Sequence, residues 1–370
     1  MEFVVRKNDL LRELQLFQGI VERKNTIPIL ANVLIEAKDK ELHLVATDLE
    51  VALRSKCDAS IAKPGALTLP AKKLYEIVKS LPETEIRVSE EKNGVKVAAD
   101  RFESRMQTLP KEDFPTLPQP TGTSGTILPR TILKEMIAKT QFAITGEDTR
   151  FFLNGALFVL GPETMSLVAT DGHRLALVSA KRDAKSSKAD VEAKPILPKK
   201  TLGELLRLLA ESEGDITFEH GENHLFFDVG GRTLISRMID GQFPAYERVI
   251  PKGNDKHIEF ERDRLTNAVK RVALLSNERS RAVKFQIERG KVDVSSSSPE
   301  LGEARESLPV DYAGTSLQIC FNAQYVLDFL AAVATDTVAL DLKDEVSQAI
   351  MTPLGTDGYD STYVIMPMRV

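Results

Sequence analysis

An internal repeat is the feature that most constrains how this chain can fold. The segment LLRELQLFQGI, which begins at Leu10, returns as ILKEMIAKTQF at Ile132, and a fainter third copy begins at Leu265. The tetrapeptide VATD stands in the same place in the first two copies, at residues 45–48 and 168–171. A period of about 120 residues is the size of a whole domain and exceeds any solenoid repeat. The sequence therefore predicts three related domains in a row.

The second half of each copy repeats as well, in the same order. The segments LPAKKLYEIVKSL, LPKKTLGELLRLL and FNAQYVLDFLAAV follow one another at this period, and the tripeptide SRM closes the first two copies at Ser104 and Ser236. Three unrelated domains would not share these motifs in one order. We place the domain boundaries near Pro120 and Pro251, which gives domains of residues 1–121, 122–252 and 253–370.

Within each copy the pattern reads helix, strands, helix, strands. Apolar side chains recur every three or four residues in the first helix, at Leu10, Leu14, Phe17 and Val21. The second helix of the middle copy has the same stripe, at Leu202, Leu205, Leu206 and Leu209. Runs such as NVLIEAKD, ELHLVATD and VALRSKCD lie between the helices and have the alternating, β-branched composition of strands. The expected fold class is α+β, with two helices packed on antiparallel sheets in each domain.

Composition is typical of a soluble protein. The apolar content of 42% over 370 residues is enough for several cores, and no apolar run approaches the roughly 20 residues that span a bilayer. The first residues, MEFVVRKNDL, carry charge where a signal peptide would be apolar, so we expect a cytoplasmic protein without membrane contact. Cys57 and Cys320 have no metal or redox spacing, so we expect both to be reduced core residues.

The sequence carries no convincing catalytic or metal site, and no cofactor is expected. Neither a GxxxxGK(S/T) phosphate loop nor a GxGxxG motif occurs. His220 and His224 lie four residues apart, but EHGENHLFF predicts a turn between strands, whereas a zinc-binding HExxH pair needs a helix. Asp171 and His173 would be an acid–base pair if the chain were an enzyme. We favour a tight connection between strands, in which Gly172 supplies a positive φ.

Several motifs are recognisable at this point: TIPIL at residues 26–30, VATDLE, LNG at 153–155, ATDGHRL at 169–175, FPAYERV at 243–249, LSNE at 275–278 and the terminal YVIMPMRV. Together, and over the whole chain, they closely resemble the family of bacterial DNA polymerase III beta subunits, the sliding clamps. The resemblance implies a non-enzymatic processivity factor that forms a head-to-tail homodimeric ring, with twelve helices around double-stranded DNA. It also implies that the ring tethers the replicative DNA polymerase, the clamp loader and repair proteins through short linear motifs. A protein-interaction scaffold that does not encircle DNA is the alternative.

A ring that encloses DNA needs only weak, sequence-independent phosphate contacts, and the net charge of −5 requires these to come from local patches. Basic residues do occur on or beside the expected inner helices. The candidate DNA-binding residues are Arg12, Arg23, Lys24, Lys72, Lys73, Lys134, Lys139, Lys199, Lys200, Arg207, Arg264, Lys270 and Arg271. A solvated helix face would explain any one of them as well. The last helix, FNAQYVLDFLAAV, has no Lys or Arg, so we expect little charge there.

The excess of acidic residues lies entirely in the third domain, where residues 253–370 carry 13 basic and 18 acidic side chains. A head-to-tail joint between the first and third domains would bring opposite charges together. The charged candidates at this dimer interface are Lys73, Arg101, Arg105, Glu300, Glu303 and Glu306. The resemblance adds Leu274 and Leu275 as an apolar centre. A solvated acidic run remains the alternative for the three glutamates.

The C-terminal segment 364–370 is apolar, and such a chain end is expected to dock against something. In the family this tail joins residues of the second domain in a surface groove that captures partner peptides. Carried onto this chain, the groove comprises Arg150, Leu153, Thr170, Gly172, His173, Arg174, Leu175, Pro244, Arg248, Val249, Val346, Val364, Met366, Pro367, Met368 and Arg369. Methionine suits surfaces that accept several partners, and arginines can rim an apolar pocket. Core packing is the alternative for Met366 and Met368.

Overall fold

The computed structural model describes residues 1–21, 26–120, 125–146, 148–182, 193–355 and 358–369. These residues form two compact units. The first unit contains the described residues of 1–131 and 200–238. The second contains the other described residues, including the C-terminal segment. Each unit therefore takes one terminal repeat and half of the middle repeat. Within these ranges, none of the helices has the length and apolar character needed to cross a membrane.

The three repeats share one order of elements. The first repeat consists of β1 (Glu2–Arg6), α1 (Lys7–Phe17), β2 (Asn32–Lys38), β3 (Glu41–Thr47), β4 (Val51–Asp58), β5 (Ser60–Lys63), β6 (Gly65–Pro70), α2 (Ala71–Ser80), β7 (Glu85–Glu91), β8 (Gly94–Ala99) and β9 (Phe102–Met106). The second repeat consists of β10 (Thr126–Leu128), α3 (Arg130–Ala138), β11 (Gly155–Leu160), β12 (Thr164–Thr170), β13 (Arg174–Lys181), β14 (Ile196–Pro198), α4 (Lys199–Glu211), β15 (Ile216–His220), β16 (His224–Val229) and β17 (Arg232–Arg237).

The third repeat follows the same plan. It consists of β18 (Lys256–Glu261), α5 (Arg262–Ala273), β19 (Ala282–Glu288), β20 (Lys291–Ser298), β21 (Gly302–Pro309), β22 (Leu317–Asn322), α6 (Ala323–Ala332), β23 (Thr337–Leu342), β24 (Ala349–Leu354) and β25 (Asp360–Ile365). The predicted pair of helices is present in every repeat. Each repeat also has a strand before its first helix, β1, β10 and β18, which was not predicted from the sequence. β10 has only three residues, too few for a periodic pattern.

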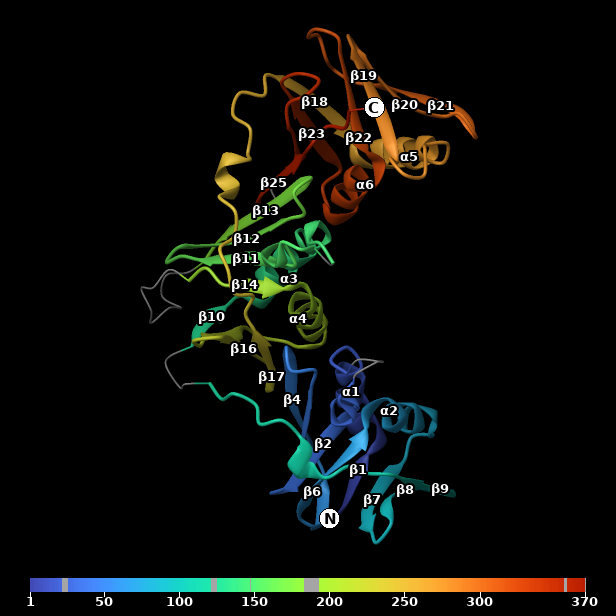
Figure 1. Ribbon diagram of the computed structural model, residues 1–370, viewed down its shortest axis with the longest axis vertical. Helices are drawn as coiled ribbons and strands as arrows, with labels where there is room; N and C mark the ends of the chain where they lie inside the picture. The colour runs from blue at the N-terminus through green and yellow to red at the C-terminus, as the bar shows by residue number, and fades with distance from the viewer. Residues whose placement is uncertain (22–25, 121–124, 147, 183–192, 356–357, 370) are drawn as a thin grey trace. The chain divides into compact units, whose positions relative to one another are not determined.

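The described residues form four sheets, and two of them run through a repeat boundary. In the first unit the larger sheet has the order β10-β15-β16-β17-β4-β3-β2-β6, so β17 of the middle repeat pairs with β4 of the first (Figure 1). In this first joint Leu234 lies opposite Leu53 and Ile235 opposite Ala52. The smaller sheet of the unit has the order β5-β1-β7-β8-β9. All of these neighbours are antiparallel, as predicted.

The second unit repeats this arrangement. Its larger sheet has the order β14-β11-β12-β13-β25-β24-β23-β18, and β25 of the third repeat pairs with β13 of the middle repeat. In this second joint Leu175 lies opposite Val364. The smaller sheet has the order β21-β20-β19-β22. β9 and β21 therefore each stand at the outer edge of a small sheet.

The helices bury the apolar stripes that the sequence predicts. α1 packs beside α2 in the first unit, and α5 packs beside α6 in the second (Figure 1). Leu10, Leu14 and Phe17 of α1 are buried, whereas the predicted Val21 lies beyond the end of the helix. In α4 the buried leucines are Leu202, Leu205, Leu208 and Leu209, so Leu208 takes the place predicted for Leu206.

Two local expectations are confirmed and one is corrected. β15 ends at His220 and β16 begins at His224, so the predicted turn joins two strands there, with the Gly221 amide donating to the His224 carbonyl over 2.8 Å. Cys57 is buried on β4. Cys320 on β22 is only half-buried, so the expectation that both cysteines are core residues is wrong for this one. Its side chain lies on the opposite face from Ile319 and Phe321, which are buried.

Candidate functional site

A tight turn between β12 and β13 carries the TDGHR motif. The Asp171 carboxylate accepts the backbone amides of His173 and Arg174 over 2.9 and 3.0 Å, and the Thr170 hydroxyl accepts the Gly172 amide over 3.1 Å. Gly172 has φ +85°, and a Cβ at this position would lie 3.0 Å from the Arg150 Nη1 atom. The predicted turn is confirmed, and both backbone conformation and space favour glycine there.

The C-terminal tail continues from β25 along this turn. Beyond the last strand pair, the Met366 amide donates to the His173 carbonyl over 2.9 Å, and the Met368 amide donates to the Cys320 carbonyl over 2.8 Å. Two backbone hydrogen bonds therefore fix the tail between the middle repeat and β22 of the third. The expected docking of this chain end is confirmed.

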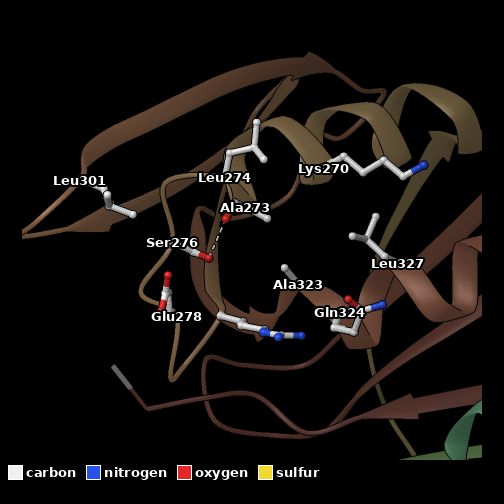
Figure 2. Close-up of a pocket in the computed structure, with 10 residues that line it drawn as sticks. Lys270, Ala273, Leu274, Ser276, Glu278, Leu301, Ala323, Gln324 and Leu327 are labelled. Atoms are coloured by element: carbon white, nitrogen blue, oxygen red, sulfur yellow. Dashed lines mark hydrogen bonds between the residues drawn. The ribbon is translucent and has the colours of Figure 1, made fainter.

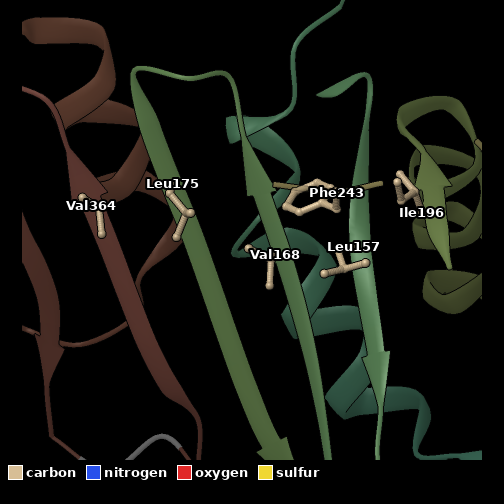
Figure 3. Packing of buried hydrophobic residues seen from close by; sticks show 6 residues of the cluster. All are labelled: Leu157, Val168, Leu175, Ile196, Phe243 and Val364. Carbon is tan, nitrogen blue, oxygen red and sulfur yellow. The ribbon is translucent and has the colours of Figure 1, made fainter. Parts of the chain in front are cut away.

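An apolar cluster lies beneath the turn and the tail. Figure 3 shows Leu157, Val168 and Leu175 on the adjacent strands β11, β12 and β13, with Phe243 packed across them and Val364 on β25. Partly buried side chains pack against this cluster from several segments: Phe152, Tyr246, Ile250 and Ile350. Exposed apolar side chains occur close in the chain to residues of this cluster or packed on it: Phe151 beside Phe152, Val249 beside Ile250, Val346 four residues before Ile350, and Met366 two residues after Val364. Such a concentration of exposed apolar side chains is typical of an interaction surface.

Charged groups surround the turn on two sides. The Arg150 guanidinium donates to both oxygens of Asp148, over 3.0 and 2.8 Å, and this pairing lowers the pKa of Asp148 to about 2. Arg150 is exposed and also donates to the Asp171 carbonyl over 3.4 Å. The Arg174 side chain is only 9% exposed and pairs with Asp171 and Asp328. The two arginines therefore differ: one faces solvent and the other is enclosed.

A hollow lies in the third repeat. It has a volume of about 500 Å³ and is lined from the C-terminal end of α5, the β20–β21 connection and the start of α6 (Figure 2). Leu274 is 76% exposed and Leu301 52% exposed at its rim. Large exposed apolar side chains beside a concave surface are typical of an interaction surface.

Comparison with known proteins identifies the family. The DNA polymerase III beta subunit family matches in three consecutive parts: the N-terminal domain over residues 1–118, the central domain over 127–245 and the C-terminal domain over 247–369. The chain belongs to this family. It therefore has three clamp domains, as expected from the sequence. It is a sliding clamp and processivity factor of DNA polymerase III, which was also expected.

Relatives of the beta subunit agree over the full length. The beta sliding clamps of Pseudomonas putida and Escherichia coli K12 are 41% and 37% identical, and each comparison covers 100% of both chains. The crystal structure of the DNA polymerase III subunit beta from Pseudomonas aeruginosa has a TM-score of 0.93 at 38% identity, with 100% of both chains covered. The beta sliding clamp from Caulobacter crescentus has a TM-score of 0.92 at 35% identity.

The predicted groove residues of this beta subunit come from five segments of the second unit: residues 150–153, 170–175, 244–249, 346 and 364–369. β13 and β25 are neighbours, the tail lies on the 170–174 turn, and Tyr246 packs on the same cluster as Leu175 and Val364. Leu153, Thr170, Leu175 and Val364 are buried, so they form the floor of the region. The exposed members are Arg150, Gly172, His173, Pro244, Arg248, Val249, Val346, Met366 and Arg369. The groove itself stays a prediction.

The candidate DNA-binding residues differ in exposure. Those whose side chains are exposed are Arg12, Lys72, Lys73, Lys199, Arg207, Arg264, Lys270 and Arg271. Lys139 is only 6% exposed and lies over the ring of Tyr359, so we no longer count it among the candidates. Lys200 is half-buried and donates to the Asp48 carboxylate and the Ile20 carbonyl. Arg23 and Lys24 lie outside the described residues.

Of the charged candidates for the dimer interface, Lys73 lies near the start of α2, Arg105 on β9, and Glu303 and Glu306 on β21. Arg101 directly precedes β9, and Glu300 lies in the connection between β20 and β21. Some already have partners within the chain: Lys73 pairs with Glu76, Arg105 with Glu91, and Glu306 with Arg271. Arg101, Glu300 and Glu303 are exposed, and Leu275 beside Leu274 is half-buried. Any joint between chains that uses the paired residues would have to exchange or extend these ion pairs.

Several residues of these surfaces were not predicted from the sequence. Phe151, which contacts Phe152, is 56% exposed, and Leu301, which lines the same hollow as Leu274, is 52% exposed. Tyr325 and Asp328 of α6 reach the enclosed Arg174. A single sequence gives no signal for them, because an apolar side chain that ends in solvent has the same local pattern as one in the core.

Proposed function

We propose that this sliding clamp works as a closed ring of two chains that encircles duplex DNA and presents a peptide-binding groove to its partners. The partners are the replicative polymerase, the clamp loader and repair proteins, each bound through a short linear motif. The ring carries out no chemistry of its own, and it acts in the cytoplasm where the DNA is. The edge strands, the basic helices and the apolar surface each support one part of this proposal.

The observation that carries the proposal is the pattern of strand joints. In both joints within the chain, the last strand of one repeat pairs with the fourth strand of the repeat before it: β17 with β4, and β25 with β13. In the described residues, β9, the last strand of the first repeat, has no such partner. β21, the fourth strand of the third repeat, also lies at the edge of its sheet. An exposed edge strand offers a row of unpaired backbone groups to another strand.

A second copy of the chain fits both edges at once. If β9 of one chain pairs with β21 of another, a head-to-tail dimer has two such joints and leaves neither edge exposed. The apolar side chains near these edges agree with this pairing: Phe102 on β9 is 38% exposed, and Leu274 and Leu301 surround the hollow beside β21. Their burial in the dimer would supply the apolar centre of the interface.

DNA contact through the helices follows from the same arrangement. The exposed basic residues lie on or beside α1, α2, α4 and α5, whereas α6 has no Lys or Arg. Scattered Lys and Arg contacts to phosphates carry no sequence information, which suits a protein that must slide. An enclosing ring stays on DNA by topology, so strong binding is unnecessary.

The peptide groove is supported by the exposed apolar side chains over the cluster of Leu175 and Val364. Val346 is 65% exposed and Val249 38% exposed. Arg248 precedes Val249 in the chain, and Arg150 contacts the turn at the Asp171 carbonyl. A partner could anchor apolar side chains there while its backbone contacts polar groups at the rim. His173 is then a wall of the groove and not a catalytic base.

The test is retention on DNA after loading by the cognate clamp loader and ATP. We expect the loaded protein to stay on circular DNA and to leave the same DNA after it has been cut once. Equal loss or equal retention on circular and linear DNA would mean ordinary binding and would favour the scaffold that does not encircle DNA. Turnover that disappears in a His173→Ala variant would instead support an enzyme.

A further inference from the structure

The side chain of Arg174 is fully engaged inside the protein. Its Nε donates to Asp171 over 3.0 Å, its Nη1 to Asp328 over 2.6 Å, and its Nη2 to the Phe142 carbonyl over 2.6 Å. The guanidinium carbon also lies 4.3 Å from the centre of the Tyr325 ring. With each nitrogen donating and one face covered, Arg174 has little left to offer a bound peptide.

Asp328 holds this arginine from another repeat. It belongs to α6, 154 residues from Arg174 in the chain, and one carboxylate oxygen takes the Arg174 hydrogen bond. The other oxygen accepts Gln324 Nε2 over 2.7 Å, one helical turn earlier. Asp328 is 22% exposed at its side chain, so the pair is shielded from solvent and its geometry is fixed from both ends.

Arg174 connects Asp328 to the 171–174 turn through hydrogen bonds. The Asp171 carboxylate accepts Arg174 Nε with one oxygen and the His173 and Arg174 amides with the other. The His173 carbonyl in turn accepts the Met366 amide. A continuous set of hydrogen bonds therefore runs from α6 through Arg174 and the turn to the tail, which carries the exposed Met366 side chain.

The first joint has the same turn but a different connection. There the Asp48 carboxylate accepts the Glu50 and Val51 amides over 2.9 and 2.7 Å, and the Arg237 amide donates to the Glu50 carbonyl over 2.8 Å. Asp48 is tied to α4 directly by Lys200. Both joints thus fasten the turn aspartate to the second helix of the next repeat, but only the second joint does so through an arginine beside the predicted groove.

We propose that Asp328 is a positioning residue for the peptide-binding surface: it holds Arg174, and through Arg174 the 171–173 turn and Met366, in the geometry that accepts a partner peptide. This inference rests on the groove of the proposed function and assigns a role to a residue outside it. Pre-organised binding surfaces gain affinity because the cost of ordering them has been met before the ligand arrives.

The test compares three variants of the full-length dimer: Asp328→Asn, which removes the charge, Asp328→Glu, which keeps it, and Asp336→Asn as a matched control at an exposed aspartate. The readout is the Kd of a labelled peptide that carries the clamp-binding segment of the cognate polymerase. We expect Asp328→Asn to weaken binding about tenfold, Asp328→Glu to restore part of the loss, and the control to match the unchanged chain.

A second readout separates positioning from general stability. Hydrogen exchange of the Met366 amide should become faster in Asp328→Asn, while the amides of Leu177 and Thr362, which lie opposite each other farther along the same joint, keep their protection. The milder Gln324→Ala variant, changed at an exposed position, should shift both readouts the same way by about twofold. It also serves if Asp328→Asn does not fold.

Each outcome decides something. If the unchanged chain does not bind the peptide, the proposed groove is wrong and the role of Asp328 falls with it. If the unchanged chain binds and Asp328→Asn binds equally well, the groove stands and the positioning role is wrong. A loss of affinity accompanied by equal loss of protection throughout β13 and β25 would mean a purely structural role and would also overturn the inference.

Discussion

A buried ion pair crosses the first joint between two side chains that are 219 residues apart in the chain. Arg232 of β17 donates to both oxygens of Glu13 in α1, over 2.7 and 2.6 Å. The Glu13 side chain is 1% exposed and that of Arg232 is 11% exposed. Such a pair contributes little net stability when intact, but removal of one charge leaves the other buried without compensation. The joint should therefore be sensitive to either residue alone.

We expect Glu13→Gln to lower the free energy of unfolding by about 3–5 kcal/mol, because Arg232 then keeps its charge without a carboxylate. Urea unfolding followed by circular dichroism measures this change. Glu83→Gln, at an exposed glutamate of the same repeat, should change the free energy by less than about 0.5 kcal/mol. Similar small changes in both variants would show that the pair is dispensable.

At the scale of elements, the edges of the two small sheets matter most. β9 has five residues and no proline, and β21 has eight residues with a proline only at its last position, Pro309. A proline inside a strand often protects a sheet edge, and neither strand has one before its last residue. Open edges of this kind are expected for strands that pair with a second chain. We therefore expect self-association to depend on a few side chains near β9 and β21.

We expect Leu274→Asp to weaken the dimer by at least about 100-fold, since it places a charge in the proposed apolar centre. The variant should fold normally, because Leu274 is 76% exposed in the single chain. Sedimentation equilibrium measures the dimer Kd.

Val346→Asp is the matched control, because Val346 is 65% exposed and belongs to the predicted groove instead. It should leave the dimer unchanged and weaken peptide binding. A Leu274→Asp protein that dimerises as tightly as the unchanged chain would place the interface elsewhere.

At the scale of the whole molecule, each large sheet contains strands from two repeats. β4 needs β17 as its neighbour, and Ala52 of β4 packs with Phe226 and Ile235 of the middle repeat. Leu117, which follows β9, the last strand of the first repeat, packs on the same cluster. A chain cut at the predicted boundary after residue 121 would keep its own repeat complete and still lose one side of its main sheet.

We therefore expect the fragment of residues 1–121 to self-associate through the edge of β4 and to melt at a lower temperature than the full chain. Light scattering after size-exclusion chromatography, over a range of concentrations, measures the association. The same fragment with Ala52→Lys should associate less, because a lysine on an edge strand opposes pairing. A monomeric fragment that melts with the full chain would mean that the repeat boundary is also a boundary of stability.

The sequence alone determined the features that depend on neighbours close in the chain. Short motifs are sufficient to predict the period of the repeat and the two helices of each copy. They also predict the turns at residues 47–51 and 170–174. Asp48 and Asp171 accept amides two and three residues later, so the local sequence is sufficient to specify those turns. The family resemblance then followed, because these motifs recur in order over the whole chain.

Only the tertiary structure decided which strands join and which charges meet. Strand pairing uses backbone groups that nearly every residue has, so the joints of β4 with β17 and of β13 with β25 leave almost no trace in the side-chain pattern. The burial of Lys139 and the contact of Arg174 with Asp328 depend in the same way on residues far away in the chain. The pattern of side chains in a short segment indicates its secondary structure, because it depends on neighbours in the chain. The strand joints and the distant ion pairs form only when the repeats pack together.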